Sequence, residues 1–168
     1  MENNERISFD DLLLLICELV SMRSTCKKYK VGCVLVRDGR IISIGYNGML
    51  SGFNHCESIL TCQRASIPSG TMYEVGNCQH AEQNAILYCA KDGIQVDGST
   101  IYVNSAVCRL CAKAIIAAGI IKVVYFDSVY DGIELLNEAG IECIKYDRHQ
   151  LDDTVNKFFD FYSHRKKA

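Results

Sequence analysis

Four residues in two short segments could together hold a metal ion and move protons. His80 and Glu82 stand in the first segment, and Cys108 and Cys111 stand in the second. One imidazole and two thiolates make three zinc ligands, and a catalytic zinc keeps its fourth position open for water. Because Zn(II) with two thiolates and a neutral imidazole is formally neutral, its water needs a base beside it. Glu82, left unligated, is the candidate for that catalytic base.

Each of these residues also has a simpler interpretation when it is taken alone. A Cys-x-x-Cys pair can be a redox pair or two small buried residues. His80 can be an ordinary polar residue near a helix start, and Glu82 can merely favour the positive end of a helix dipole. The joint pattern, in which each half begins a helix and a strand lies between the halves, is much harder to obtain by chance. It therefore favours the metal site.

Hydrophobic spacing predicts the elements that must position these residues. Apolar residues at helical spacing predict a first helix over 8–22, with Ser8 as its N-cap. Two β-rich runs, 31–36 and 41–46, flank Asp38-Gly39 and predict a hairpin. Helices are then expected at 80–90, 108–118, 132–139 and 151–162, and strands at 100–104, 122–126 and 142–146. This alternation predicts parallel pairing behind an opening antiparallel hairpin, hence an α/β fold.

The segment 47–79 has no such periodicity, and it contains the only proline of the chain, Pro68. A structureless segment of this length is uncommon inside a compact domain. Something other than an apolar core is expected to hold it, and a metal ion is the first candidate.

Bulk properties bound the size of the fold and the kind of partner. A chain of 168 residues with 49% hydrophobic residues is expected to form a single domain, 1–168, around one core. Its net charge of -2 gives no support for a nucleic-acid partner, so a small substrate is expected.

The number of cysteines and the first residues of the chain indicate the cellular compartment in which the protein is expected. Ten cysteines indicate either an oxidising compartment or metal binding. Residues 1–11 lack the basic region and the cleavage site of a signal peptide. The apolar run 12–17 is far shorter than the roughly 20 residues that span a bilayer. A cytoplasmic protein with reduced thiols and no membrane partner is therefore expected.

The two metal-binding segments resemble the zinc signature of nucleobase deaminases. Over nearly its whole length the chain resembles bacterial and phage deoxycytidylate (dCMP) deaminases. The stretches that carry this resemblance are Arg23-Ser24-Thr25-Cys26, Val31-Gly32-Cys33-Val34-Leu35-Val36, Gly45-Tyr46-Asn47-Gly48, His80-Ala81-Glu82-Gln83-Asn84-Ala85-Ile86 and Cys108-Arg109-Leu110-Cys111-Ala112-Lys113. The first and third are the more specific, because related base and tRNA deaminases generally lack that pair.

The resemblance implies a fold, a reaction and substrate contacts. The fold would be the three-layer α/β/α arrangement of cytidine deaminases with a five-stranded mixed sheet, and the reaction would convert dCMP to dUMP with release of ammonia. Asn47 would lie near the substrate, and the Ala81 backbone would read the pyrimidine carbonyl. Ser24 and Tyr130 are further candidates for phosphate and substrate contact. From the sequence alone, Asn47-Gly48 could equally be a hairpin-like turn, and Tyr130 could be an ordinary core or surface aromatic.

The resemblance also bears on a second metal, on assembly and on regulation. Similar bacterial deaminases carry cysteines at several of the positions Cys26, Cys56, Cys62 and Cys78, which suggests a structural zinc that clamps the long segment, with His55 as a neighbouring candidate. The alternative is that these cysteines are small buried hydrophobes. Relatives imply a homo-oligomer, a hexamer, and regulation by dCTP and dTTP.

One departure from the family pattern keeps other functions open. Val107 stands where the family usually has proline before the first metal-binding cysteine. Proline would preset the chain for helix entry, so its loss removes rigidity but no ligand. Deamination of another base, such as cytosine, guanine or a tRNA adenosine, is one alternative. A zinc-stabilised binding protein without catalysis is another.

Overall fold

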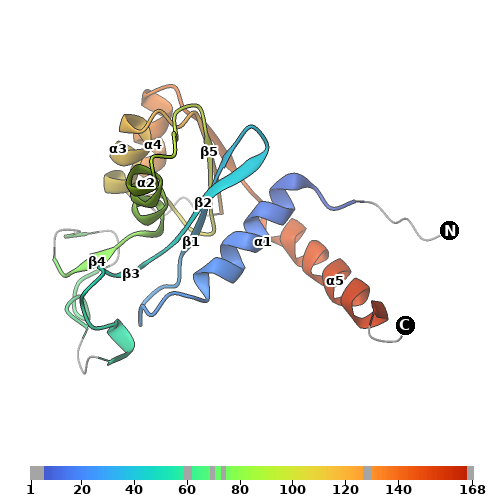
Figure 1. Ribbon diagram of the computed structural model, residues 1–168, viewed down its shortest axis with the longest axis horizontal. Coiled ribbons are helices and arrows are strands. Elements are labelled where there is room, and N and C mark those ends of the chain that lie inside the picture. The colour runs from blue at the N-terminus through green and yellow to red at the C-terminus, as the bar shows by residue number, and fades with distance from the viewer. Residues whose placement is uncertain (1–5, 59–61, 69–70, 73–74, 127–129, 166–168) are drawn as a thin grey trace.

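A five-stranded mixed sheet forms the central layer of the fold (Figure 1). The computed structural model describes residues 6–58, 62–68, 71–72, 75–126 and 130–165. The strand order is β2-β1-β5-β6-β7, with β1 antiparallel to β2 and β5, and with β5, β6 and β7 parallel. The strands are β1 (Gly32–Arg37), β2 (Arg40–Tyr46), β5 (Thr100–Val103), β6 (Lys122–Tyr125) and β7 (Glu142–Lys145). The predicted opening hairpin and parallel second half are confirmed.

The turn between β1 and β2 has the backbone that its sequence predicts. Asp38 and Gly39 both have positive φ, 52° and 71°. Two successive residues of positive φ make the type of turn whose twist suits a tight hairpin. The turn pairs Arg37 with Arg40, and an irregularity between Leu35 and Val36 then shifts the register by one residue, so that Gly32 pairs with Tyr46.

Helices cover both faces of the sheet, which confirms the predicted three layers (Figure 1). On one face, α1 (Phe9–Ser21) and α5 (Arg148–Arg165) bury Leu13, Leu14 and Leu151 against β1, β5 and β6. The other face is covered by α2 (Ala81–Asp92), α3 (Arg109–Ala117) and α4 (Gly132–Glu138). None of the helices within the described residues is long and apolar enough to cross a membrane.

Side-chain hydrogen bonds fix the first turn of α1 to the sheet and to α5. Ser8 caps the helix as predicted and accepts from the backbone N of Asp11. Tyr102 donates to Asp10 at 2.7 Å, Tyr146 donates to Asp11, and Thr154 donates to Asp11 at 3.1 Å. These contacts join α1 to β5, to the residue after β7, and to α5.

The last helix is longer than the apolar spacing predicts. It begins at Arg148, three residues before Leu151, because the Asp147 carboxylate accepts from the backbone N of His149 and so satisfies an N-terminal donor. Arg148 then pairs with Glu18 and lies over the Phe126 ring, 4.5 Å from its centroid. Polar contacts, which hydrophobic periodicity does not detect, therefore set this end of α5.

The long segment 47–79 is closed at its ends by two short strands. Within it, β3 (Gly48–Met49) pairs antiparallel with β4 (Cys78–Gln79), and a short 3-10 helix covers Cys56–Ser58. Lys28 donates to the carbonyls of Arg64 and Ile67 at 3.0 and 2.6 Å. The Arg64 guanidinium in turn donates to the carbonyls of Thr71, Met72 and Val75. Polar contacts to backbone carbonyls thus hold much of the described part of this segment.

Candidate active site

Two helix N-termini place the four predicted residues. His80 is the N-cap of α2 with an extended backbone, and Glu82 lies in the first turn. Cys108 is likewise the extended N-cap of α3, and Cys111 lies in its first turn. Neither side chain makes a capping hydrogen bond, and the two lie side by side in the site, with His80 Nδ1 3.3 Å from Cys108 Sγ. The change from extended to helical backbone at the cap explains how His80 and Glu82, only two residues apart, can serve one site.

The three candidate ligands converge to a distance that suits zinc. His80 Nδ1 lies 3.3 Å from Cys108 Sγ and 3.4 Å from Cys111 Sγ, and the three ligand atoms all lie within 4.8 Å of one another. Tetrahedral bonds of about 2.3 Å to sulfur and 2.0–2.1 Å to nitrogen require N to S separations of about 3.6 Å. The donor set and its spacing therefore fit a zinc ion with one position left open.

Hydrogen bonding within this group favours the thiolate form of Cys108. The Cys111 thiol and the His80 imidazole both donate to Cys108, and these contacts hold the pKa of Cys108 far below its usual range. The hydrogen bond to Cys108 also raises the pKa of His80. Bonding to Cys108 and burial raise the pKa of Cys111 instead. A bound cation would replace the shared protons, because thiolates are the form that binds metal.

Glu82 is the buried carboxyl of the site. It is 3% exposed, and burial raises its pKa above the ordinary value, although the neighbouring His80 acts in the opposite direction. Its carboxyl lies outside the group of mutually close ligand atoms, which comprises His80, Cys108 and Cys111 among the described residues. A carboxyl that binds protons more readily than usual and is not a ligand suits a proton carrier.

A pocket opens onto this group, and most of the predicted substrate residues line it. Asn47, Ala81 and Tyr130 lie in its wall together with His80 and Glu82. The Asn47 side chain accepts from Val31 N and donates to Tyr29 O, both at 2.8 Å, so it holds the 29–31 loop to the end of β2. The structure thus has β3 beginning at Gly48 in place of a tight Asn-Gly turn.

Ser24 is placed differently from the other predicted contacts. It is 1% exposed and lies outside the residues that line this pocket. Its hydroxyl accepts from the backbone N of Cys26 at 3.2 Å. In this structure Ser24 shapes the loop that leads to Cys26.

Comparison with known proteins agrees with this geometry. Residues 7–127 match the family model described as the cytidine and deoxycytidylate deaminase zinc-binding region. The chain belongs to this deaminase family. It is 39% identical to ComE operon protein 2 of Bacillus subtilis (strain 168), over 90% of this chain and 76% of the relative. It is 33% identical to the deoxycytidylate deaminase of enterobacteria phage T4, over 87% of this chain and 96% of the relative.

A solved deaminase structure shares the fold of most of the chain. The dCMP deaminase of cyanophage S-TIM5, in complex with dCMP and dUMP, aligns with a TM-score of 0.72 at 32% identity. The alignment covers 85% of this chain and all of that chain (100%). The predicted cytidine-deaminase-like fold is therefore confirmed, and the chain is a zinc-dependent hydrolase of the deaminase family.

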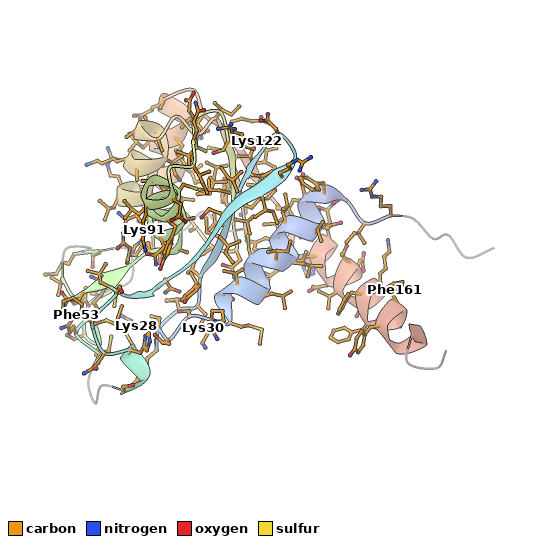
Figure 2. All side chains as sticks on the ribbon, in the orientation of Figure 1. Lys28, Lys30, Phe53, Lys91, Lys122 and Phe161 are labelled. Atoms are coloured by element: carbon orange, nitrogen blue, oxygen red, sulfur yellow. The ribbon has the colours of Figure 1, made fainter. Side chains whose placement is uncertain are left out.

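Sequence reasoning missed several of the residues that line the deaminase pocket. Lys28, Tyr29 and Arg64 line it alongside the residues discussed above. Lys28 comes from the loop after α1 and lies beside the long segment (Figure 2). Its closeness to Cys26 in the sequence could have identified it, whereas Arg64 lies in a stretch without periodicity and gave no signal.

Cys26, Cys62 and Cys78 line the same pocket and Cys56 lies beside Cys78, but the four cysteines do not reach a common ligand distance. Cys56 Sγ lies 3.9 Å from Cys78 Sγ, close to the roughly 3.8 Å expected for two thiolates on one tetrahedral zinc. Cys26 and Cys62 are near enough to affect the pKa of both. Among the described residues, however, the only group of three ligand atoms within 4.8 Å is the one at His80. The His55 side chain is exposed.

Packing supports Val107, the position at which the family resemblance predicts proline. Val107 is fully buried in the core next to Cys108. A β-carbon at Gly132 would clash with the Val107 carbonyl oxygen and lie 2.7 Å from the Cys108 carbonyl carbon. The first residue of α4 therefore packs directly on the entry to α3, and this contact restrains the segment that proline would otherwise stiffen.

Proposed function

We propose that the chain catalyses the hydrolytic deamination of dCMP to dUMP with release of ammonia. The observation that carries this proposal is the meeting of His80, Cys108 and Cys111 beside a buried glutamate in one pocket. Deoxycytidylate deaminases of phages T4 and T2 are 33% and 34% identical to the chain, and the S-TIM5 enzyme binds dCMP and dUMP.

Glu82 carries the protons in this proposal. When bound by His80, Cys108 and Cys111, zinc supplies the Lewis acid that activates the hydrolytic water. Glu82 accepts a proton from that water and delivers it to the pyrimidine ring nitrogen. It then takes the proton of the hydroxyl group added to the ring carbon and passes it to the amino group, which leaves as ammonia while the carbonyl forms. Its burial supports this role, because a carboxyl shielded from bulk solvent exchanges protons with the substrate in preference to water.

The pocket offers contacts for both ends of the nucleotide. We assign the Ala81 backbone to the pyrimidine carbonyl, and Asn47 and Tyr130 to the sugar and base side of the substrate. Lys28 and Arg64 supply positive charge in the same wall, where a phosphate group would be stabilised. In this assignment Ser24 acts indirectly, through the loop that carries Cys26 and Lys28.

A second, structural zinc forms part of the proposal. Cys26, Cys56, Cys62 and Cys78 would bind it and clamp the 47–79 segment within a single domain, 1–168. The separation of Cys56 and Cys78 supports this arrangement, since a shift of the other two thiols would complete a tetrahedral site. The ion would then brace the same wall that holds Lys28 and Arg64.

Assembly and regulation follow the family in this proposal. The chain would act as a homo-oligomer, a hexamer as in relatives, with dCTP and dTTP as effectors. The substrate is a small nucleotide, and neither nucleic acid nor a membrane takes part.

The experiment that tests the function is ammonia release from a panel of substrates. Zinc-loaded protein is assayed with dCMP, CMP, deoxycytidine, cytosine and guanine under one set of conditions. We expect dCMP to give the highest kcat/KM and deoxycytidine, which lacks the phosphate, to be much poorer. Faster turnover of a free base than of dCMP would contradict the substrate assignment, and a loaded protein inactive on the whole panel would contradict the enzyme.

A further inference from the structure

A buried asparagine follows strand β5, just before the stretch that carries Cys108. Asn104 is 7% exposed, so its side-chain amide needs partners within the protein. The backbone N of Asn104 donates to Gly32 O at 3.2 Å, which extends the antiparallel pairing of β5 with β1. Gly32 N donates in return to the Asn104 side-chain oxygen at 2.8 Å, in the place of a backbone carbonyl. The side chain therefore completes the last pair of the ladder while the main chain leaves the sheet.

The two segments joined by this pair both contribute to the wall of the deaminase pocket. Residues of the stretch 105–108 line the pocket directly after Asn104, and residues of the stretch 29–31 line it directly before Gly32. Asn47 holds the 29–31 stretch from the β2 side, because its side-chain oxygen accepts from the backbone N of the last residue of that stretch at 2.8 Å. Two asparagine side chains thus bind successive backbone N–H groups at the edge of the pocket. Asn104 is not among the residues that line the pocket, so it acts on the pocket through its neighbours.

Helices α1 and α5 hold the other half of the Asn104 amide. Asn104 Nδ2 donates to one carboxylate oxygen of Glu18 at 2.9 Å, and the second oxygen of Glu18 accepts from Arg148 at 3.3 Å. The Arg148 guanidinium also lies over the Phe126 ring. Because an amide has one accepting end and one donating end, the Glu18 contact fixes which end faces Gly32. A chain of polar contacts therefore runs from α5 through α1 to the wall of the pocket.

Close packing fixes the β1 side of the pair. A β-carbon at Gly32 would clash with Cys17 O and lie 2.7 Å from Ser21 N, so the main chain of β1 lies directly on α1. Because β1 has little room to move, loss of the Asn104 contacts would displace the 105–108 stretch instead. That stretch carries part of the pocket wall and ends at the candidate zinc ligand Cys108.

We propose that Asn104 is a positioning residue of the pocket, which fixes the 105–108 stretch against the 29–31 stretch and is itself oriented by Glu18 and Arg148. The inference rests on the proposed deaminase function, because part of its effect is measured on dCMP. It adds to that function a link between the two outer helices and the pocket.

Reversal of the hydrogen bond between Asn104 and Glu18 tests this proposal on the full-length, zinc-loaded chain. Asn104→Asp keeps an acceptor for Gly32 N but places a second carboxylate against Glu18. Adding Glu18→Gln to that variant restores one donor and one acceptor between the two side chains, and the glutamine oxygen can still accept from Arg148. Asn104→Leu removes the donor and the acceptor together, so Glu18→Gln should not rescue it.

The measurements separate positioning from stability. They are kcat and KM for dCMP above neutral pH, zinc content, denaturant unfolding, and amide hydrogen exchange of the Gly32 N–H. Thr154→Val is the matched control, because Thr154 is 4% exposed and donates to Asp11, and neither residue lines the pocket. This control should lower the free energy of unfolding and leave KM and the exchange of Gly32 unchanged.

We expect Asn104→Asp and Asn104→Leu each to lower kcat/KM for dCMP about tenfold, mostly through KM, the effect of one lost hydrogen bond. Exchange of the Gly32 N–H should quicken by a similar factor, and zinc content should stay at the wild-type value. Glu18→Gln should recover most of both losses in the Asn104→Asp background only.

Two results would overturn the proposal. One is a folded Asn104→Leu variant with wild-type KM and wild-type exchange at Gly32, which would leave Asn104 with a role in stability alone. The other is an Asn104→Asp loss that Glu18→Gln does not reduce. A wild type that does not turn over dCMP would instead refute the proposed function, and exchange at Gly32 would still decide whether Asn104 and Glu18 hold this part of the pocket.

Discussion

The Glu82 carboxyl lies beside the three candidate ligands and is shielded from bulk water, so its protonation is linked to the reaction in the pocket. Replacing it with glutamine keeps the shape of the side chain and removes the proton acceptor. We expect Glu82→Gln to lower kcat by about 10²–10⁴-fold, the usual contribution of a general acid-base residue. Zinc content should stay at the wild-type value, because Glu82 is outside the ligand group. Loss of zinc in this variant would show that Glu82 supports the metal instead.

Lys28 offers a second test at the residue scale, since it lines the pocket and has three donors of which two contact backbone carbonyls. We expect Lys28→Met to raise KM for dCMP about tenfold or more, because a charge-assisted contact to phosphate is lost. Turnover of deoxycytidine, which has no phosphate, should change little. Lys30→Met is the control, since Lys30 is exposed nearby (Figure 2) and is not among the residues that line the pocket. An equal loss for both substrates would mean that Lys28 only supports the 47–79 segment.

The sequence was sufficient to predict the site residues that lie in short motifs of recognisable residue type and spacing. His80, Glu82, Cys108 and Cys111 lie in short segments at helix starts, so residue type and spacing alone predicted that they meet. Arg64 could not be found in this way. Its place in the pocket depends on contacts with carbonyls of the 71–75 stretch and with Lys28, which come from the folded segment and not from any periodic pattern.

At the scale of elements, the start of α2 is positioned by close packing on β2. A β-carbon at Gly45 would clash with the Ala81 carbonyl oxygen and lie 2.7 Å from Ala85 N. We therefore expect Gly45→Ala to cost about 1–3 kcal/mol of unfolding free energy, as overpacking usually does. It should also lower kcat, because it displaces the turn that carries Glu82.

The control for this change is Gly48→Ala, whose added carbon would meet only Thr25 Oγ1, at 3.9 Å. Denaturant unfolding and dCMP turnover are measured on both variants. Equal stability and activity in Gly45→Ala and the wild type would show that α2 can move away from β2 without disturbing the site.

The anchoring of α1 predicts a loss of stability at alkaline pH. Burial, followed by the hydrogen bond to Asp11, raises the pKa of Tyr146 to about 12. An unfolded tyrosine ionises near pH 10. Between about pH 10 and pH 12 the unfolded chain releases this proton while the folded chain keeps it, so stability falls as the pH rises through that window.

Denaturant unfolding across this pH range checks the prediction. Tyr146→Phe should be less stable at neutral pH, where the hydrogen bond is lost, and should show a shallower decline above pH 10. Tyr29→Phe, at a tyrosine that is 61% exposed, is the control. A decline as steep in Tyr146→Phe as in the wild type would assign the alkaline transition to other groups.

Elements with long apolar patterns were predicted well, and the exceptions have clear physical causes. The hairpin around Asp38-Gly39 and the helix after Ser8 follow directly from turn and cap chemistry. The two-residue strands β3 and β4 are too short to show alternation, so only the fold reveals their pairing. The early start of α5 depends on Asp147, whose role as a cap is not visible in hydrophobic spacing.

At the scale of the whole molecule, the sheet brings the start of α2 and the start of α3 to one place. Both helices pack on the same face: α2 leads into β5, and α3 connects β5 to the parallel strand β6. The alternation of strand and helix predicted this topology, and the family comparison confirms it. The grouping of the four cysteines around 47–79 was predicted from the family resemblance and not from periodicity, because a pair separated by 22 residues, such as Cys56 and Cys78, has no periodic signature.

The central claim is that one zinc ion is bound by His80, Cys108 and Cys111 within reach of Glu82. An anomalous-difference map of crystals of the chain, recorded on both sides of the zinc absorption edge, tests it most directly. The account predicts a zinc peak about 2.0–2.1 Å from His80 Nδ1 and about 2.3 Å from both sulfurs. A disulfide between Cys108 and Cys111, or ordered side chains with no zinc peak between them in zinc-loaded protein, would contradict it.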